Sequence, residues 1–218
     1  MKKLYTILTF TIAIAFASSS YAEVKYGVSA ALTKIAASGS ETEGGEKTTK
    51  DVDALAVIPS IFAEYQYSDT LAVGVDYIPF AADVSDKTHK RTDTETSVAG
   101  TAASTSLTRN QKAEAELSNH TTLYANYAIG DAYIKVGAVY VELDTNESLD
   151  TGAKYGNETL YGGLIGLGME DGNIRLELTY TDYEDVSLTS SVARTGVTNN
   201  NKIEADLDAT ALRLSYVF

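Results

Sequence analysis

The chain has 218 residues, no cysteine, two prolines and 44% hydrophobic residues. It is therefore neither a disulfide-stapled domain nor a protein with cysteine-ligated metal, and its length suits one or two domains. The 17 basic residues against 30 acidic ones give a net charge of −13, which argues against a nucleic acid bound through a basic face. Fifteen tyrosines and 16 glycines favour strands and loops over a helical bundle.

The N-terminus has the features of a secretory signal peptide. It begins with two lysines, continues through an apolar run over residues 4–17, and ends in small residues at 20 and 22. That run is shorter than the roughly 20 residues that a membrane-spanning helix needs. We expect cleavage after Ala22, so that residues 1–22 are removed and residues 23–218 form a single β-barrel domain.

From Val24 onward, apolar and polar residues alternate with the period of two that is typical of strands. In the stretch that ends at Ile129, we place Leu117, Leu123 and Tyr127 on one apolar face. The alternation predicts eight strands, over 24–32, 55–67, 71–77, 117–129, 134–140, 161–169, 174–180 and 212–218.

The connections between these strands alternate in length. Three have only two or three residues, whereas four are long and polar, over 36–53, 81–112, 144–157 and 182–202. We therefore predict an all-β fold, an eight-stranded antiparallel up-and-down transmembrane β-barrel with short periplasmic turns and long extracellular loops. The second long connection could carry its own hairpin, which leaves a ten-stranded barrel open.

A secreted barrel whose apolar stripe faces an internal ligand is the alternative. The tyrosines favour the membrane barrel, because aromatic girdles lie where a barrel meets the membrane interface. Six tyrosines lie on the apolar stripe near the short-turn ends: Tyr26, Tyr65, Tyr67, Tyr77, Tyr127 and Tyr216.

Charged residues occupy the face opposite the apolar stripe. In a membrane barrel this face lines the lumen, where charges must be paired. The predicted lumen network consists of Lys25, Glu64, Asp76, Lys135, Arg175, Glu177 and Arg213. It acts either as a paired plug or, if Arg175 and Arg213 exchange partners, as a gate for a narrow polar path.

The last seven residues, 212–218, resemble the closing strand of Gram-negative outer-membrane β-barrel proteins. With the signal peptide and the alternation, the whole chain is similar to the small eight-stranded barrels of the OmpA-transmembrane, OmpX and OmpW types. The resemblance implies residence in the bacterial cell outer membrane, among its lipid and lipopolysaccharide. It also implies a recognition signal for the barrel-assembly machinery, carried by Leu212, Leu214, Tyr216 and Phe218.

One stretch departs from this pattern. Ile203, Ala205 and Leu207 alternate on the opposite parity to the apolar residues of the closing strand. The slip predicts either a β-bulge near Ala209–Ala211 or an extension that stands clear of the lipid.

These features favour a structural or weakly pore-forming envelope protein. Its long loops make a surface adhesin or receptor the alternative. A lipid-modifying enzyme has less support, because no serine stands at the spacing from His120 that a lipid-A deacylase motif would show. His89 lies in a charged loop and is either solvated or in contact with lipopolysaccharide phosphate. We expect no catalytic residues, no cofactor and no metal-ligand set.

Most of the acidic residues fall in the four long connections and the strand ends that adjoin them. Lipopolysaccharide is also anionic, so this face would repel it unless divalent cations bridge the two. We therefore expect divalent cations at the acidic loops.

Overall fold

The computed structural model describes residues 23–43, 46–85, 88–93, 107–148, 154–193 and 200–218. The predicted signal peptide lies outside these residues and stays a prediction. None of the described residues forms a helix long and apolar enough to cross a bilayer. The described chain is all β, and every strand pairing in it is antiparallel.

Seven of the eight ring strands are longer than the sequence predicted, and β3 has the predicted bounds. Their bounds are β1 Val24–Glu43, β2 Glu46–Gln66, β3 Leu71–Tyr77, β4 Ala82–Ser85, β5 Thr88–Asp93, β6 Leu107–Ile129, β7 Ala132–Ser148, β8 Glu158–Asp171, β9 Ile174–Tyr183, β10 Val186–Ala193 and β11 Asn200–Val217.

Eight of these strands close into a ring. The order is β1-β2-β3-β6-β7-β8-β9-β11, and β11 pairs back onto β1. Strands β4 and β5 pair with β6 beyond the end of β3, while β10 pairs with β11 beyond the end of β9. The predicted eight-stranded antiparallel barrel is confirmed. The ten-stranded alternative is wrong, because the described residues of the second long connection lengthen one wall and add no strand to the ring.

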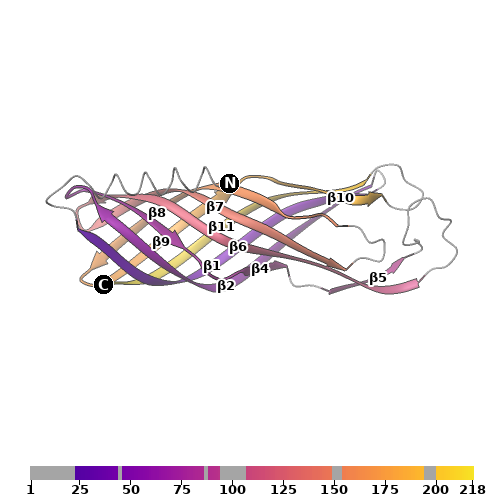
Figure 1. Cartoon of the computed structure of the whole chain (residues 1–218), viewed down its shortest axis with the longest axis horizontal. Helices are drawn as coiled ribbons and strands as arrows, with labels where there is room; N and C mark the ends of the chain where they lie inside the picture. The colour runs from indigo at the N-terminus through magenta and orange to yellow at the C-terminus, as the bar shows by residue number, and fades with distance from the viewer. Residues whose placement is uncertain (1–22, 44–45, 86–87, 94–106, 149–153, 194–199) are drawn as a thin grey trace, which may run out of the picture.

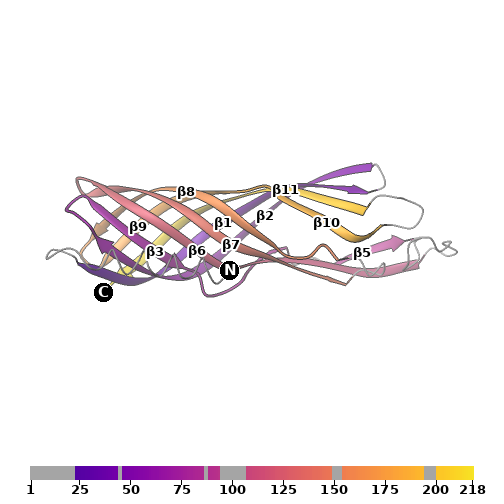
Figure 2. The ribbon, with the colours of Figure 1, turned by 45° about the horizontal axis from the view of Figure 1, so that its top comes forward.

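The two ends of the barrel differ. The short turns at 67–70, 130–131 and 172–173 lie with the C-terminus at the left of Figure 1. Gly130 and Gly172 take positive φ values of 64° and 58° there, a conformation that costs glycine little. At the other end the β1–β2 hairpin, β10 with β11, and β5 with β6 extend separately from the barrel (Figure 2).

Much of what the sequence predicted as loop is strand. The β1–β2 ladder continues through Ala36↔Asp53 to Glu43↔Glu46, so the loop predicted over 36–53 is wrong. Likewise β7 continues to Ser148 and β11 begins at Asn200. These segments are polar outside and small or apolar inside, so they lack the outward apolar stripe by which strands were recognised.

The bulge predicted near Ala209–Ala211 is wrong, because β11 pairs with β1 and β9 there without a register shift. The odd-numbered residues of β11 face inward along its whole length. What changes along the strand is whether the apolar residues lie on the outer or the inner face. Ile203, Ala205 and Leu207 therefore belong to an extension in which the inner face is apolar.

A bulge does occur in β6. The β6–β7 register shifts between Ser118 and Thr121, and Asn119 there has a φ of 53°. The extra residue reverses which side chains face inward, so Leu117 is buried while Leu123 is 42% exposed. The prediction that both lie on one face is wrong for this reason.

Candidate functional site

The outer wall next to the short turns is apolar. Its large hydrophobic side chains are exposed although they lie in the middle of regular strands; they include Val28, Leu32, Ile61, Leu123, Val136, Ile165, Leu167, Leu176, Leu178, Leu212 and Leu214. A continuous outward apolar belt on a closed sheet is stable only against lipid.

Four of the six predicted girdle tyrosines are exposed within a few residues of the short turns or termini, namely Tyr26, Tyr67, Tyr127 and Tyr216. The Phe218 ring stacks on Tyr26 at 5.5 Å and meets Tyr216 edge-on at 5.2 Å. The other two differ: Tyr77 lies at the far end of β3, and Tyr65 is only 7% exposed.

The closing strand presents the predicted assembly residues outward. Leu212, Leu214 and Tyr216 are 44–56% exposed, and Phe218 is 59% exposed. Recognition of these residues by the barrel-assembly machinery stays a prediction.

The predicted lumen charges line the lower lumen, which is the part beside the short turns, in two groups. In the first group, Arg175 donates to both oxygens of Glu64 at 3.0 Å each. Arg175 also donates to Glu170 at 2.6 and 2.8 Å, and Lys25 donates to the other Glu170 oxygen at 2.8 Å. Asn126 donates to Glu64 at 2.7 Å. The residues come from β1, β2, β6, β8 and β9, so closure of the ring is needed to bring the whole group together.

The second group joins Arg213, Asp76, Lys135 and Glu177. Arg213 pairs with Asp76, which also accepts a 2.9 Å hydrogen bond from Ser60. Lys135 pairs with Glu177, and Arg213 Nε lies 4.0 Å from the same carboxylate.

Aromatic rings surround both groups. The Lys135 ammonium lies 4.1 Å from the Tyr124 ring centroid, and the Arg175 guanidinium lies 5.1 Å from that of Phe62, distances suited to cation–π attraction. Gly168 makes room for Tyr133, because a Cβ there would lie 2.2 Å from the Tyr133 ring.

The eight charges of the ion-pair plug are Lys25, Lys135, Arg175, Arg213, Glu64, Asp76, Glu170 and Glu177, four of each sign. The sequence pattern does not single out Glu170, because Glu170 lies beside the turn at Gly172. Glu170 alternates in phase with Gly166 and Gly168, which are both buried positions. This phase is the feature of the sequence that could have placed Glu170 in the lumen. The plug is paired, formally neutral and largely buried.

A cavity of about 60 Å³ lies in the middle of the lumen, next to Arg213. Its polar lining is Thr33, Thr122, Thr179, Thr181, His120 and Arg213, and the rest is aliphatic or aromatic. The β6 bulge turns His120 inward, where its Nε2 lies 3.0 Å from the Tyr183 hydroxyl. Among the described residues, His120 Nδ1 and Arg213 Nε are buried without a hydrogen-bond partner.

Above the cavity the interior is apolar. Val141 is fully buried, and Leu160 is 1% exposed. They pack in one cluster with Ile35, Leu117, Val139, Leu143, Leu164, Tyr183, Val186, Leu188, Leu207 and Ala209. We call this cluster the upper core.

Within the described residues, the barrel wall is interrupted at two places. Between β9 and β10, hydrogen bonds from Glu184 N to Tyr161 O at 2.8 Å and from Ser187 N to the Glu158 carboxylate at 3.2 Å hold the wall to β8. Between β3 and β4, the described residues contain no ladder to β2: β2 pairs with β3 only over Ile61–Gln66, and β4 pairs with β6.

The outward side chains at this β2–β4 gap are apolar. Leu55 and Val57 on β2 and Phe80 on the connection after β3 are 61–70% exposed. Pro59 lies in the same stretch of β2 and has no N–H to donate. Ile58, Ile78 and Phe80 also line the mid-lumen cavity, so the cavity reaches the wall at this gap.

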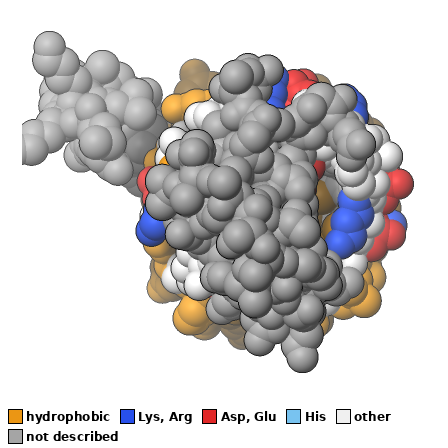
Figure 3. Space-filling view, turned by 90° about the vertical axis from the view of Figure 1, so that its right-hand side faces the viewer, with side chains coloured by type: hydrophobic (Ala, Val, Ile, Leu, Met, Phe, Trp, Pro, Cys, Tyr) orange, Lys and Arg blue, Asp and Glu red, His pale blue; other side chains and the backbone are white. Residues whose placement is uncertain are grey.

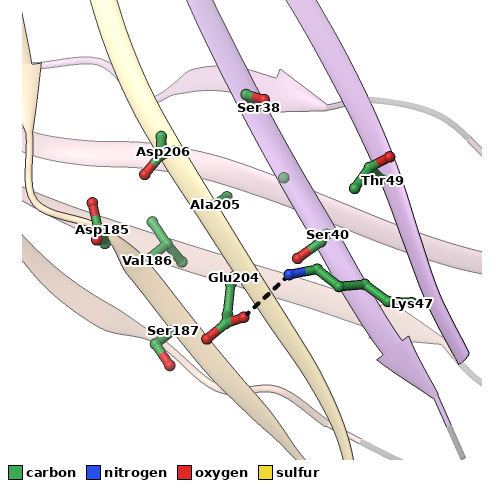
Figure 4. Close-up of a pocket in the computed structure, with 11 residues that line it drawn as sticks. Ser38, Ser40, Lys47, Thr49, Asp185, Val186, Ser187, Glu204, Ala205 and Asp206 are labelled. Carbon is green, nitrogen blue, oxygen red and sulfur yellow. Dashed lines mark ion pairs between the residues drawn. The ribbon is translucent and has the colours of Figure 1, made fainter. Parts of the chain in front are cut away.

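A second hollow, of about 400 Å³, lies on the outside of the extension (Figure 4). Ser38, Thr49 and Asp185 line it, and Lys47 reaches to within 4.0 Å of Glu204. A hydrogen bond with Asp185, together with the negative charge of that residue, raises the pKa of Asp206.

The expected divalent cations find no chelating set in the described part of the chain, where no group of three or more histidine, cysteine or carboxylate side chains could hold a metal ion. Seen from the end opposite the short turns, described charged side chains lie on the near rim and hydrophobic ones lie around the barrel behind them (Figure 3). The side chain of His89 lies outside the described residues.

A closed antiparallel barrel with an outward apolar belt, short turns at one end and a paired ionic lumen is a transmembrane β-barrel of the outer-membrane type. The protein belongs to this class and resides in the bacterial outer membrane.

No protein-family model matches the sequence, and no curated protein matches it. Among solved structures, the chain is similar to the outer membrane protein AlkL in lipid bilayers, with 17% identity over 92% of this chain and 93% of that one and a TM-score of 0.51. It is also similar to the outer membrane protein OprG from Pseudomonas aeruginosa, with 15% identity over 88% and 96% and a TM-score of 0.49.

The outer membrane protease OmpT from Escherichia coli matches with 10% identity over 94% of this chain and 100% of that one, and a TM-score of 0.45. Identities of this size speak for the fold and not for an activity.

Proposed function

We propose that the protein exchanges small apolar molecules between its lumen and the outer leaflet of the membrane, through the β2–β4 gap. The observation that carries this proposal is the mid-lumen cavity, whose lining reaches the exposed Phe80 at a wall interruption without a ladder. An apolar solute crosses such an interruption without stripping water from polar groups, since the rim is apolar.

The plug supports a lateral route over an axial one. Moving a solute along the axis past Arg175 and Glu64 would break buried ion pairs, which is costly when one partner is left unpaired. A solute that leaves through the gap does not meet these pairs, because the gap lies on the cavity side of the plug.

Uptake of radiolabelled benzene by bacteria that produce the protein tests this route. Ala31→Phe fills the cavity, because Ala31 lines it and is 3% exposed. It should remove most of the uptake that the protein adds. Ala30→Phe is the matched control, since Ala30 is the adjacent outward residue of β1. Equal uptake by the Ala31→Phe protein, with its barrel shown intact by a gel shift on heating, contradicts the route.

Weak ion conduction along the axis is a second candidate function, favoured by the polar lower lumen. Its gate would be an exchange of partners by Arg175 and Arg213 among Glu64, Asp76 and Glu177, which already lie within one connected lumen. Planar bilayers should then show small conductance steps that change in Glu64→Gln. Silent bilayers at every voltage would exclude conduction and leave the lateral route untouched.

A further inference from the structure

The lining of the mid-lumen cavity contains polar groups that passage of hydrocarbon does not require. Thr33, Thr122, Thr179 and Thr181 are each 3–7% exposed and line it together with His120 and Arg213. The wall toward the gap is instead made of aliphatic side chains such as Ile58 and Ile78. The cavity thus offers both hydrogen-bonding groups and apolar surface, and Ile58 and Ile78 lie where a molecule would enter.

Two nitrogens of residues that line the cavity have no hydrogen-bond partner in the described structure. Arg213 uses Nη1 on Asp76 and on Ser60 at 3.2 Å, while its Nε is buried without a hydrogen bond in the described structure. His120 uses Nε2 on Tyr183 and leaves Nδ1 buried and unpaired. Native proteins rarely leave buried nitrogens without a hydrogen bond. A group that forms hydrogen bonds with these two nitrogens is therefore expected beside them.

The charge balance selects a neutral group. The plug carries four cations and four anions, and Arg213 is already paired with Asp76. A ligand carboxylate would add an uncompensated negative charge to a buried site, whereas a neutral oxygen adds none. A neutral oxygen can accept from Arg213 Nε–H and from a threonine hydroxyl.

We propose that this cavity binds the neutral oxygen of a small aliphatic alcohol or ketone, with the carbon chain directed toward the β2–β4 gap. The inference rests on the proposed lateral route for entry and names the chemical class that the site prefers. The cavity of about 60 Å³ has room for about two water molecules, so it suits a head group, while the chain occupies the apolar side.

The test is a titration of the full barrel in lipid nanodiscs, followed by NMR of methyl-labelled alanine and threonine. Three probes of equal size, 1-butanol, n-pentane and propionate, separate a neutral oxygen, no oxygen and a charged oxygen. We expect 1-butanol to produce saturable shifts at Ala31 and Ala211, which line the cavity, and to bind more tightly than the other two.

Thr181→Val keeps the side-chain volume and removes one hydroxyl, so it should weaken 1-butanol binding about fivefold, as expected for one neutral hydrogen bond. Thr33→Val is a second variant with the same expectation. Thr210→Val is the control, because Thr210 lies between the cavity residues Ala209 and Ala211 but is exposed on the outer face.

Equal affinity for 1-butanol and n-pentane, or unchanged binding in both threonine variants, overturns the polar site and leaves the lateral route standing. Tight, threonine-dependent binding of 1-butanol without any uptake of benzene by cells supports the site and overturns the route. Shifts that never saturate, at Thr210 as much as at Ala31, indicate solvent in lipid only and overturn the site.

Discussion

The half of the barrel beside the short turns and the half beyond the cavity share continuous strands. They differ in which face of the wall carries the polar side chains. On β11, Leu212 and Leu214 face outward while Arg213 is buried. Higher on the same strand, Leu207 is buried and Asp206 is exposed. The first half is apolar outside and ionic inside, and the second half is the reverse.

The backbone alternation is the same in both halves, so the difference follows from what surrounds the wall. Lipid outside favours the apolar residue on the outer parity, and water outside favours the polar one. Neighbouring strands switch at the same level: Lys34, Asp53, Asp182 and Asp208 are the first outward charges on β1, β2, β9 and β11. This level marks the outer surface of the membrane, and the gap and cavity lie just beneath it.

The largest expected difference between the two halves appears when a buried ion pair of the plug loses one partner. Arg175→Met leaves the carboxylate of Glu64 buried without its bidentate partner and should lower the free energy of unfolding by about 3–5 kcal/mol. Urea titration of the lipid-folded barrel measures it. Lys34→Met is the control, because its 3.1 Å pair with Asp53 is exposed and contributes about 0–1 kcal/mol. Equal losses in the two variants would contradict a desolvated plug.

Lysine substitutions at two levels of β11 test whether the two halves face different solvents. Leu214→Lys puts a charge near the middle of the apolar belt and should cost about 2–4 kcal/mol. Asp206→Lys places the same side chain on the same parity of β11, eight residues away and above the belt, and should cost little. Unfolding free energies from the same urea titration test this. A similar cost at both positions would mean that the two halves do not face different solvents.

The sequence was sufficient for the lower half and insufficient for the upper one. Alternation and turn lengths predicted the eight-stranded ring, because an outward apolar stripe is visible wherever lipid demands it. The sequence predicts a loop where β1 and β2 extend beyond Ala36 and Asp53, because a water-facing wall with small inner residues resembles loop composition.

The candidate site escaped prediction for a different reason. The bulge at Asn119 turns His120 into the lumen without any compositional marker, and the cavity exists only where β3 stops pairing with β2 at Tyr77. Such breaks depend on the whole ring. Each of the seven predicted lumen charges lies in an unbroken strand, on the face opposite the apolar stripe of that strand. The sequence alone could therefore identify them.

The smallest effect concerns the water-facing half, where Asp206 shares a hydrogen bond with Asp185. Its raised pKa means that the folded extension holds a proton more tightly than the unfolded chain does. The stability that this proton contributes is present at low pH and is lost as the pH rises through the raised pKa of Asp206. Asp206→Asn cannot lose a proton, so protection of the Val186 and Leu188 amides from hydrogen exchange, corrected for intrinsic rates, should exceed that of the wild type at pH 7 and match it at low pH. Asp53→Asn, on another part of the outer wall, should leave these amides unchanged. A wild-type β10 that is better protected at pH 7 than at low pH would contradict the shared proton and the like-charge contact behind it.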